Sequence, residues 1–243
     1  MKGTKIIFRS IVVTFAVFLF TVIFIRLSAQ TVKAAETSSI NIPSTYVNVG
    51  LPKGLVMLPD GNLWYVDVLN FRIVLFDPES NTILRTVGRK GTAEGEFEEG
   101  IYAITRDNQG YLYVLHYSCM VYKLDSNGGF IGKYNLYDAD PNCSVTQSEG
   151  ITYDSYSDSL YITYRDKGTV NKFSKSLVFI SSFGSTSCPT PEVTPTPTGL
   201  PEEFCQPRGI TTDTHGRIYV ADSGNSRIQV YSPTYSLLLS IDS

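Results

Sequence analysis

The sequence predicts an all-β fold made from a four-strand unit that occurs four times along the chain. One observation is the pattern D-x-x-N-x-R-I, which stands as DVLNFRI from Asp67 and again as DSGNSRI from Asp222. Another is a series of apolar or alternating segments of five or six residues, bounded by Gly, Pro, Asn or Ser. The 16 Tyr and 13 Phe among 243 residues also favour strands.

The last unit shows the layout most clearly. We expect its strands at Gly209–Asp213, Arg217–Asp222, Arg227–Ser232 and Leu237–Asp242. The same layout occurs three times upstream, so the ends of the second strands align at Asp67, His116, Tyr164 and Asp222. These positions are 49, 48 and 58 residues apart. Four strands in every 45–50 residues is typical of a propeller blade.

The predicted blades cover residues 51–88, 100–135, 148–184 and 206–242. The longer last step is explained by a Pro/Thr-rich insert at 188–205, which contains PTPEVTPTPTGLP. So many prolines predict an extended surface loop rather than a strand. The insert is either a recognition arm or an insertion that the surface tolerates.

Residues 209–232 resemble the NHL repeat, because they follow its pattern from the first strand to the R-I-Q of the third. The stretch from Trp64 to Asp77 matches it in part, and the resemblance as a whole covers about 45–243. It implies a β-propeller, most often of six blades, which serves in some members as a scaffold for binding protein or RNA. Some similar propellers are enzymes, so the fold leaves the activity open.

Four blades are visible where the resemblance implies six. We expect an open ring with about two blades missing; the alternative is a closed four-bladed ring. Ser44–Val49 reads as a single strand before the first blade. In each blade an aromatic residue of the second strand is expected to pack against a neighbouring blade: Trp64, Tyr113, Tyr161 and Tyr219.

The N-terminal residues 1–35 form a targeting segment that precedes the propeller domain of 36–243. Lys2, Lys5 and Arg9 come before an apolar run from Ser10 to Ile25. This pattern is typical of a signal peptide or of a retained helical membrane anchor. Both place the propeller outside the cytoplasm, secreted or at the cell surface, because the basic end stays inside.

Four cysteines fit an exported protein, and no C-x-x-C motif is present. In the predicted blades all four fall in loops of one face, which we call the upper face. The second strand of each blade ends there. We expect disulfides between Cys119 and Cys143 and between Cys188 and Cys205.

The candidate binding site is the rim of the upper face, where Asp67, His116, Tyr164 and Asp222 occupy equivalent positions. Such a ring could bind a cation or a hydroxylated ligand. The alternative is that these residues shape their loops. Asp67 would then pair with Arg72 and Asp222 with Arg227, while Asn70 and Asn225 adopt left-handed turn conformations.

The net charge and the number of histidines argue against two classes of function, nucleic-acid binding and a His-rich metal site. A net charge of −3 gives no reason to expect nucleic acid, and two His leave little material for a His-rich metal site. We therefore expect no cofactor, no metal and no catalytic residues, and a propeller that binds a protein or glycan ligand. It would also contact the membrane if the N-terminal segment is retained. The alternative is a metal-dependent propeller hydrolase or lyase, similar to lactonases or amidating lyases.

Overall fold

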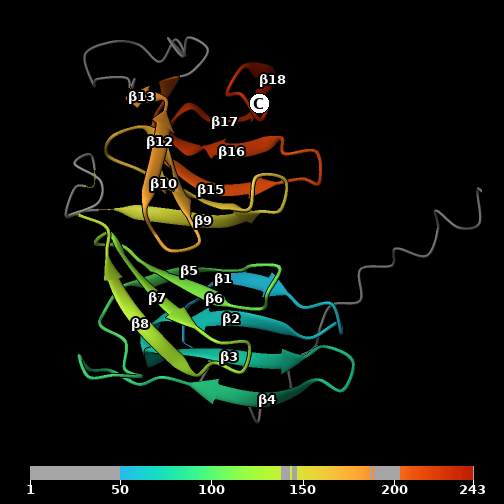
Figure 1. Ribbon diagram of the computed structural model, residues 1–243, viewed down its shortest axis with the longest axis vertical. Helices are drawn as coiled ribbons and strands as arrows, with labels where there is room; N and C mark the ends of the chain where they lie inside the picture. Colours follow the sequence, from blue (N-terminus) through green and yellow to red (C-terminus); the bar gives the residue numbers. More distant parts are fainter. Residues whose placement is uncertain (1–49, 138–142, 144–146, 187, 189–202, 243) are drawn as a thin grey trace, which may run out of the picture. The chain divides into compact units, whose positions relative to one another are not determined.

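The computed structural model describes residues 50–137, 143, 147–186, 188 and 203–242 (Figure 1). The predicted targeting segment with its helix, the single strand at Ser44–Val49 and most of the Pro/Thr-rich insert lie outside these residues. No helix in the described part of the chain is long and apolar enough to cross a membrane.

The described chain is all-β and has the four-bladed propeller arrangement predicted from the sequence. Each blade is a four-stranded antiparallel sheet whose strands are neighbours in chain order. Blade 1 consists of β1 (Pro52–Met57), β2 (Leu63–Asp67), β3 (Arg72–Asp77) and β4 (Thr82–Val87). Blade 2 consists of β5 (Ile101–Arg106), β6 (Leu112–His116), β7 (Met120–Leu124) and β8 (Phe130–Asn135).

Blades 3 and 4 repeat this arrangement. Blade 3 consists of β9 (Ser148–Asp154), β10 (Ser159–Tyr164), β11 (Thr169–Ser174) and β12 (Phe179–Phe183). Blade 4 consists of β15 (Pro207–Thr212), β16 (Ile218–Asp222), β17 (Arg227–Tyr231) and β18 (Leu237–Asp242). Between them, β13 (Ser185–Thr186) pairs in parallel with β14 (Glu203–Phe204).

The first strands of the blades lie side by side, β1 against β5, β5 against β9 and β9 against β15. They are therefore the innermost strands. Among the described strands, no comparable packing joins β1 to β15.

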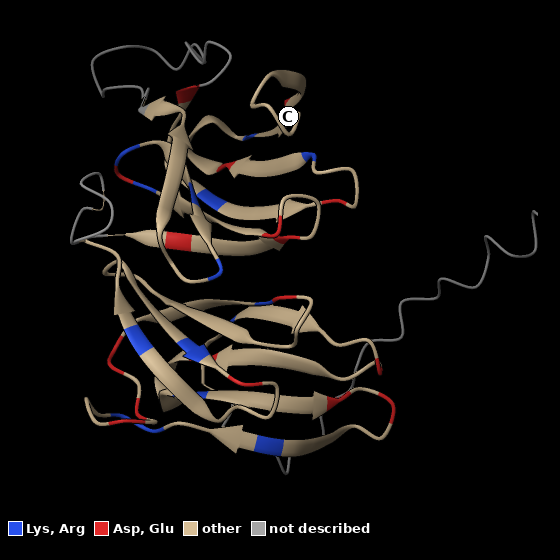
Figure 2. Ribbon diagram, in the orientation of Figure 1, with Lys and Arg blue, Asp and Glu red and all other residues tan. Residues whose placement is uncertain are grey.

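Acidic residues fix the turns between the first and second strands, and Asp and Glu recur in the loops of the molecule (Figure 2). Asp107 Oδ1 accepts hydrogen bonds from the amides of Gln109 and Tyr111 at 2.9 Å each. Asp213 does the same in blade 4. In these two turns the left-handed residue is glycine, with φ of 94° at Gly110 and 75° at Gly216.

Glycines in the inner strands let neighbouring blades approach closely. A Cβ on Gly54 would lie 2.5 Å from the Cα of Ala103 in blade 2. A Cβ on Gly150 would lie 2.3 Å from the carbonyl oxygen of Arg208 in blade 4. Both distances are below van der Waals contact, so the inner strands pack this tightly only because these residues lack a side chain.

We expect Gly150→Ala to destabilise the protein by about 2–3 kcal/mol, because the added methyl group forces blades 3 and 4 apart. Urea unfolding followed by tryptophan fluorescence and circular dichroism measures this loss. Gly209→Ala is the matched control: its Cβ would meet only Ala221, at 3.7 Å. Equal losses for the two variants would show that the inner strands of blades 3 and 4 are not packed as described.

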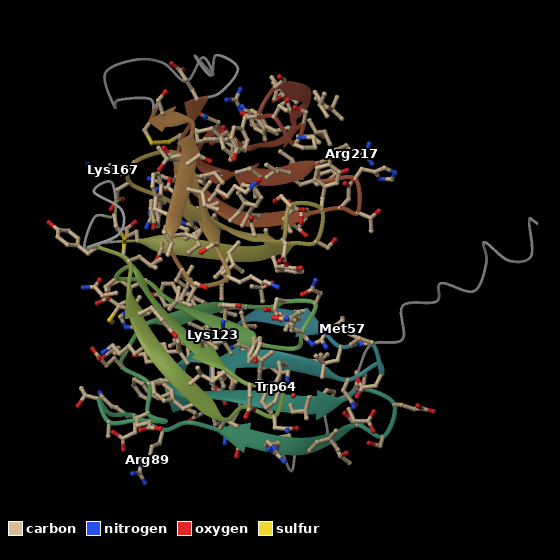
Figure 3. All side chains as sticks on the ribbon, viewed as in Figure 1. Met57, Trp64, Arg89, Lys123, Lys167 and Arg217 are labelled. Carbon is tan, nitrogen blue, oxygen red and sulfur yellow. A yellow bond between two sulfur atoms is a disulfide. The ribbon has the colours of Figure 1, made fainter. Side chains whose placement is uncertain are left out.

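The hydrophobic core lies between successive blades, in clusters that join blade 1 to 2, 2 to 3 and 3 to 4. The predicted aromatic positions are fully buried at Trp64, Tyr113 and Tyr161. Figure 3 labels the first of them, Trp64, within the part of the molecule that blades 1 and 2 form. Tyr113 donates a hydrogen bond to the carbonyl oxygen of Lys175 in blade 3, 3.2 Å away, so this side chain faces the next blade. Tyr219 is only partly buried. The prediction is wrong there, because no described blade follows blade 4.

The same difference appears along the third strands. Ile73, Val121 and Val170 occupy the second position of β3, β7 and β11 and are fully buried. Ile228 holds this position in β17 and is 42% exposed. It lies beside Ala221 and Ile241 in a shallow hollow of about 470 Å³. Blade 4 therefore presents to solvent the face that blades 1 to 3 bury.

Blade 1 exposes the opposite face. Leu55 and Met57 of β1 are 61% and 54% exposed. Their counterparts in blade 4 face blade 3: Ile210 packs against the cluster that joins these two blades, and the Thr212 hydroxyl donates a 3.3 Å hydrogen bond to the carbonyl oxygen of Tyr153. The described propeller thus has two uncovered apolar faces, one on each end blade. The six-bladed ring stays a prediction.

Both predicted disulfides are present. Cys119 pairs with Cys143, with Cα atoms 6.1 Å apart, and Cys188 pairs with Cys205 at 4.6 Å. The first ties the β6–β7 loop to the connection between blades 2 and 3. The second closes a 17-residue step across the Pro/Thr-rich insert, which in the chain-entropy model stabilises the fold by roughly 3 kcal/mol.

Candidate binding face

The two D-x-x-N-x-R-I phrases form the same structure in blades 1 and 4. Asp67 Oδ2 accepts hydrogen bonds from Asn70 Nδ2 and Arg72 Nε, both at 2.9 Å. Asp222 Oδ2 accepts them from Asn225 Nδ2 and Arg227 Nε, both at 2.8 Å. Both aspartates are fully buried, so each carboxylate neutralises an arginine and holds its loop. The predicted ion pairs are confirmed.

The left-handed residue of these loops is one position later than predicted. Val68–Asn70 and Ser223–Asn225 form single 3₁₀ turns, and the residues that end them, Phe71 and Ser226, each have φ of 53°. The asparagines lie inside the 3₁₀ turns without a positive φ, and their side-chain amides donate to the aspartates. The expectation for Asn70 and Asn225 was therefore wrong.

His116 takes the equivalent position in blade 2 and is buried with both ring nitrogens engaged. Nδ1 accepts a hydrogen bond from the amide of Ser118 at 3.1 Å, so Nε2 carries the proton and donates to the carbonyl oxygen of Glu99 at 2.5 Å. The ring also stacks on Tyr117, with centroids 4.8 Å apart. Burial lowers the pKa of His116 below 6.5, more than the Glu99 carbonyl raises it.

This arrangement predicts a pH dependence of stability. The unfolded chain takes up a proton on His116 near pH 6.5, while the folded protein resists it. The contribution is therefore fully present above pH 6.5 and is lost as the pH falls through the folded-state pKa. We expect the free energy of unfolding to fall more steeply between pH 7 and 5 in the wild type than in His116→Gln. Parallel pH profiles from urea titrations would contradict a buried neutral imidazole.

Tyr164 completes the predicted rim in blade 3 and is also buried. All four predicted rim residues thus lie inside their blades, beneath the upper face. Their geometry supports the loop-shaping alternative, and direct ligand binding by them remains an untested prediction.

A second set of equivalent residues lies at the start of the innermost strands, one position after the partners of the rim residues. Asp67, His116, Tyr164 and Asp222 pair with Pro52, Ile101, Ser148 and Pro207. The residues that follow these partners are Lys53, Tyr102, Glu149 and Arg208. The strand register shifts by one residue at this step in every blade. Such a bulge bends the strand and redirects side chains.

The four side chains of this set converge. The ammonium group of Lys53 lies 3.3 Å from the ring centroid of Tyr102, in the next blade. The pKa of Lys53 is lowered chiefly by desolvation; the carboxylate of Glu149 raises it and the guanidinium of Arg208 lowers it further. Residues of blades 1, 3 and 4 are therefore close enough to interact electrostatically.

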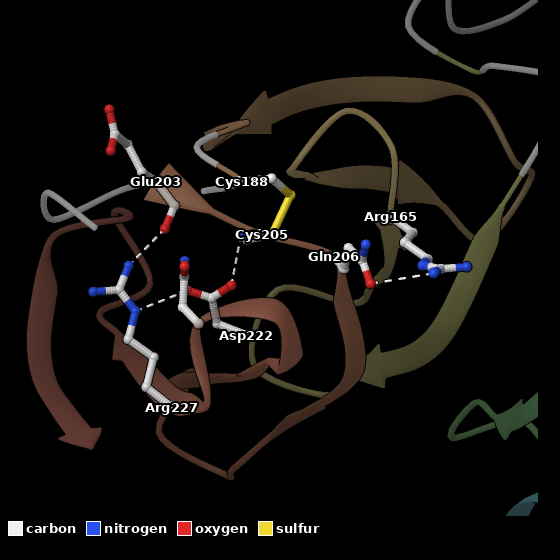
Figure 4. Close-up of a disulfide and its surroundings, with 8 residues drawn as sticks. Arg165, Cys188, Glu203, Cys205, Gln206, Asp222 and Arg227 are labelled. Carbon is white, nitrogen blue, oxygen red and sulfur yellow. Dashed lines mark hydrogen bonds and ion pairs between the residues drawn. A yellow bond between two sulfur atoms is a disulfide. The ribbon is translucent and has the colours of Figure 1, made fainter. Parts of the chain in front are cut away.

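Arg165, in the loop after β10, joins the set from blade 3. Its Nη1 lies 3.8 Å from Glu149 Oε1, and its Nη2 donates a 3.1 Å hydrogen bond to Gln206 Oε1 (Figure 4). We call Lys53, Tyr102, Glu149, Arg165 and Arg208 the mouth cluster, since they surround the upper ends of the innermost strands.

The Cys188–Cys205 disulfide braces this region. The amide of Cys205 donates to Asp222 Oδ1 at 2.6 Å, and Arg227 Nη2 donates to the carbonyl oxygen of Glu203 at 2.8 Å (Figure 4). Gln206, next to the disulfide, holds Arg165. The buried aspartate of the D-x-x-N-x-R loop therefore fixes the segment that positions one side of the mouth cluster.

The described residues contain no group of three or more His, Cys, Asp or Glu placed to hold a metal ion. The mouth cluster is instead basic and aromatic, with one carboxylate. Its chemistry suits an anionic ligand bound through charge-assisted hydrogen bonds.

Comparison with known proteins agrees with this fold. The family model of the NHL repeat matches residues 204–231, which form β14 to β17 of the last blade. The last blade therefore matches an NHL repeat, and the similarity to propeller structures is consistent with the NHL-type β-propeller that the sequence resemblance implied. No curated protein matches the sequence significantly.

Solved propeller structures resemble the chain at low sequence identity. They include a streptogramin B lyase, with a TM-score of 0.55 and 16% identity; the match covers 79% of this chain and 54% of the lyase chain. U3-55K has a TM-score of 0.58 and 14% identity, over 79% of this chain and 54% of its own. The WD40 repeats of RRP9 have a TM-score of 0.56 and 13% identity, and the match covers 79% of this chain and 53% of the RRP9 chain. The chain thus spans about half the length of these structures, and the likeness concerns the fold.

Proposed function

We propose that this protein is an exported or membrane-anchored scaffold that binds a protein or glycan ligand on the upper face of its propeller. The observation that carries this proposal is the mouth cluster, in which equivalent positions of all four blades hold unlike polar side chains that converge. Residues that only shape a repeat tend to recur in each unit, as Asp67 and Asp222 do. Lys, Tyr, Glu and Arg at one repeated position suit recognition of a ligand instead.

The proposed location outside the cytoplasm rests on the basic and apolar N-terminal sequence and on two disulfides. Disulfides persist in oxidising compartments. Residues 1–35 would act as a cleaved signal or as a retained anchor, and residues 36–243 as the binding domain. Protease treatment of intact cells, followed by N-terminal sequencing of the protein, tests this location and decides between the two alternatives.

We also propose that the working ring has six blades, of which four are described. The two uncovered apolar faces support this, and so does the fact that this chain spans only about half of the similar propellers. A further blade on each open face would bury Ile228 on one side and Leu55 on the other, as the three existing interfaces bury their counterparts. A uniform, concentration-independent monomer of the 243-residue chain that binds no hydrophobic dye would contradict the proposal.

Site-specific photo-cross-linking tests the binding role. A benzophenone amino acid at position 167, an exposed residue of the β10–β11 loop on the upper face, should capture a partner on the surface of the source cells. The same group at position 217, in a turn on the opposite face, should not. Arg217 is a suitable control because it is exposed and its loss is expected to cost less than about 1 kcal/mol of stability. Equal capture at both positions, or at neither, would contradict binding at the upper face.

A metal-dependent lyase or hydrolase is the second candidate, and the likeness to a streptogramin B lyase is the observation that favours it. The residues outside the described ranges would have to supply ligands in that case. Metal analysis of the purified full chain tests it: a stoichiometric divalent ion that chelators remove would favour the enzyme over the scaffold.

A further inference from the structure

We propose that the mouth cluster recognises an acidic peptide segment of a partner protein. This inference rests on the proposed binding function and names the ligand class for the same face. It is argued from the charge of the cluster, from the groups it leaves available and from the spacing of its cations.

The mouth cluster is basic within an acidic protein. It contains three cations, Lys53, Arg165 and Arg208, and one carboxylate, Glu149. Its formal charge is therefore +2 (3 − 1), against −3 for the whole chain. The acidic residues that precede β5 are already engaged: Glu98 pairs with Lys133, and Glu99 lies 3.7 Å from Lys90. The local excess of positive charge thus remains for a ligand.

Two of the cations also have hydrogen-bond donors that are not used within the described structure. Arg208 is exposed, and its guanidinium has no hydrogen bond or ion pair with any described residue. Arg165 Nε is buried and lacks a hydrogen-bond partner in the described structure. Desolvation is the main cause of the lowered pKa of Lys53, and the positive charge of Arg208, which repels that of Lys53, lowers it further. A carboxylate placed between them would remove this repulsion and form charge-assisted hydrogen bonds with both.

The side chains match a peptide better than a small ion. Guanidinium groups bind carboxylates in a bidentate manner, and clusters of Arg are a recurring means of recognising acidic segments. Tyr and Arg are also the residues that most often anchor protein interfaces. Because the cations come from three different blades, carboxylates spaced along one extended chain can engage several of them together.

Fluorescence anisotropy with a fluorescein-labelled hexaglutamate peptide tests the proposal on the full chain. We expect saturable binding that weakens as salt is raised, and no binding of a labelled hexalysine peptide. Arg208→Ala and Lys53→Ala should each weaken binding at least tenfold. Both side chains belong to exposed residues, so circular dichroism spectra should match the wild type. Arg217→Ala removes an exposed cation from the opposite face and should leave affinity unchanged.

The possible outcomes are distinct. Binding of a hexagalacturonate oligosaccharide but not of hexaglutamate would overturn the peptide assignment in favour of an acidic glycan. Binding of neither, while the cross-linker at position 167 still captures a partner, would overturn the anionic ligand class and leave the proposed function standing. Equal losses of hexaglutamate affinity in the Arg217→Ala and Arg208→Ala variants would show a non-specific charge effect and overturn the mouth cluster as the binding site.

Discussion

Tyr161→Ala should destabilise the protein by about 4 kcal/mol, whereas Tyr219→Ala should cost less than half as much. The two tyrosines occupy the same position of β10 and β16, the middle region of the second strand. Tyr161 is fully buried between blades 3 and 4, with its ring 6.5 Å from Tyr235 and perpendicular to it. Its removal leaves a large cavity in an interblade core. Tyr219 faces the open side of blade 4, so its loss leaves no enclosed cavity.

Urea unfolding of the two variants, followed by circular dichroism, measures this difference. Tyr219 donates a 3.1 Å hydrogen bond to Asp213 Oδ2, which truncation also removes. Tyr219→Phe therefore serves as the control that separates the hydrogen bond from the packing of the ring. Equal destabilisation of Tyr161→Ala and Tyr219→Ala would show that a further protein surface covers blade 4.

Asp222→Ala should cost about 3–5 kcal/mol, because it leaves a buried arginine without its counter-charge. Asp222 is fully buried and the side chain of Arg227 is only 7% exposed. The same substitution deprives the amide of Cys205 of its acceptor, so the disulfide-linked segment above the loop also loses an anchor. Asp222→Asn can still accept hydrogen bonds and should cost less.

The Asp213–Arg217 pair provides the comparison. Its nitrogen–oxygen distance is 2.6 Å, but the arginine is 47% exposed. Arg217→Ala should therefore cost less than about 1 kcal/mol despite the shorter contact. Thermal or urea unfolding measures both losses of stability. Similar losses for Asp222→Ala and Arg217→Ala would show that the buried Asp222–Arg227 pair does not stabilise the blade.

Much of this architecture could be predicted from the sequence because the information is local and repeated. Strands of five or six residues between turn residues, recurring at a nearly constant spacing, define blades without knowledge of tertiary contacts. The D-x-x-N-x-R phrase fixes one loop by short-range hydrogen bonds, so its ion pairs were predictable. The residue that adopts the left-handed conformation was not, since Phe71 and Ser226 have no common chemistry.

The mouth cluster could not be predicted from composition or motif. Its members at the repeated position are Lys53, Tyr102, Glu149 and Arg208, which share no side-chain type, so no repeat is visible in the letters. They become equivalent only through strand pairing, one residue after the partners of the rim positions. The bulge that redirects them depends on the register between two strands. Likewise, the exposure of Tyr219 depends on a neighbour and not on its own sequence.

The uncovered face of blade 4 is tested most directly by hydroxyl-radical footprinting with mass spectrometry, on protein diluted until it is monomeric. Four aliphatic residues share one position of the third strand: Ile73, Val121, Val170 and Ile228. The side chains of Ile73, Val121 and Val170 are 0% exposed, whereas Ile228 is 42% exposed. We therefore expect Ile228 to be oxidised readily and the other three to be protected. Protection of Ile228 to the same degree as Ile73, Val121 and Val170 would contradict it and establish a closed four-bladed ring.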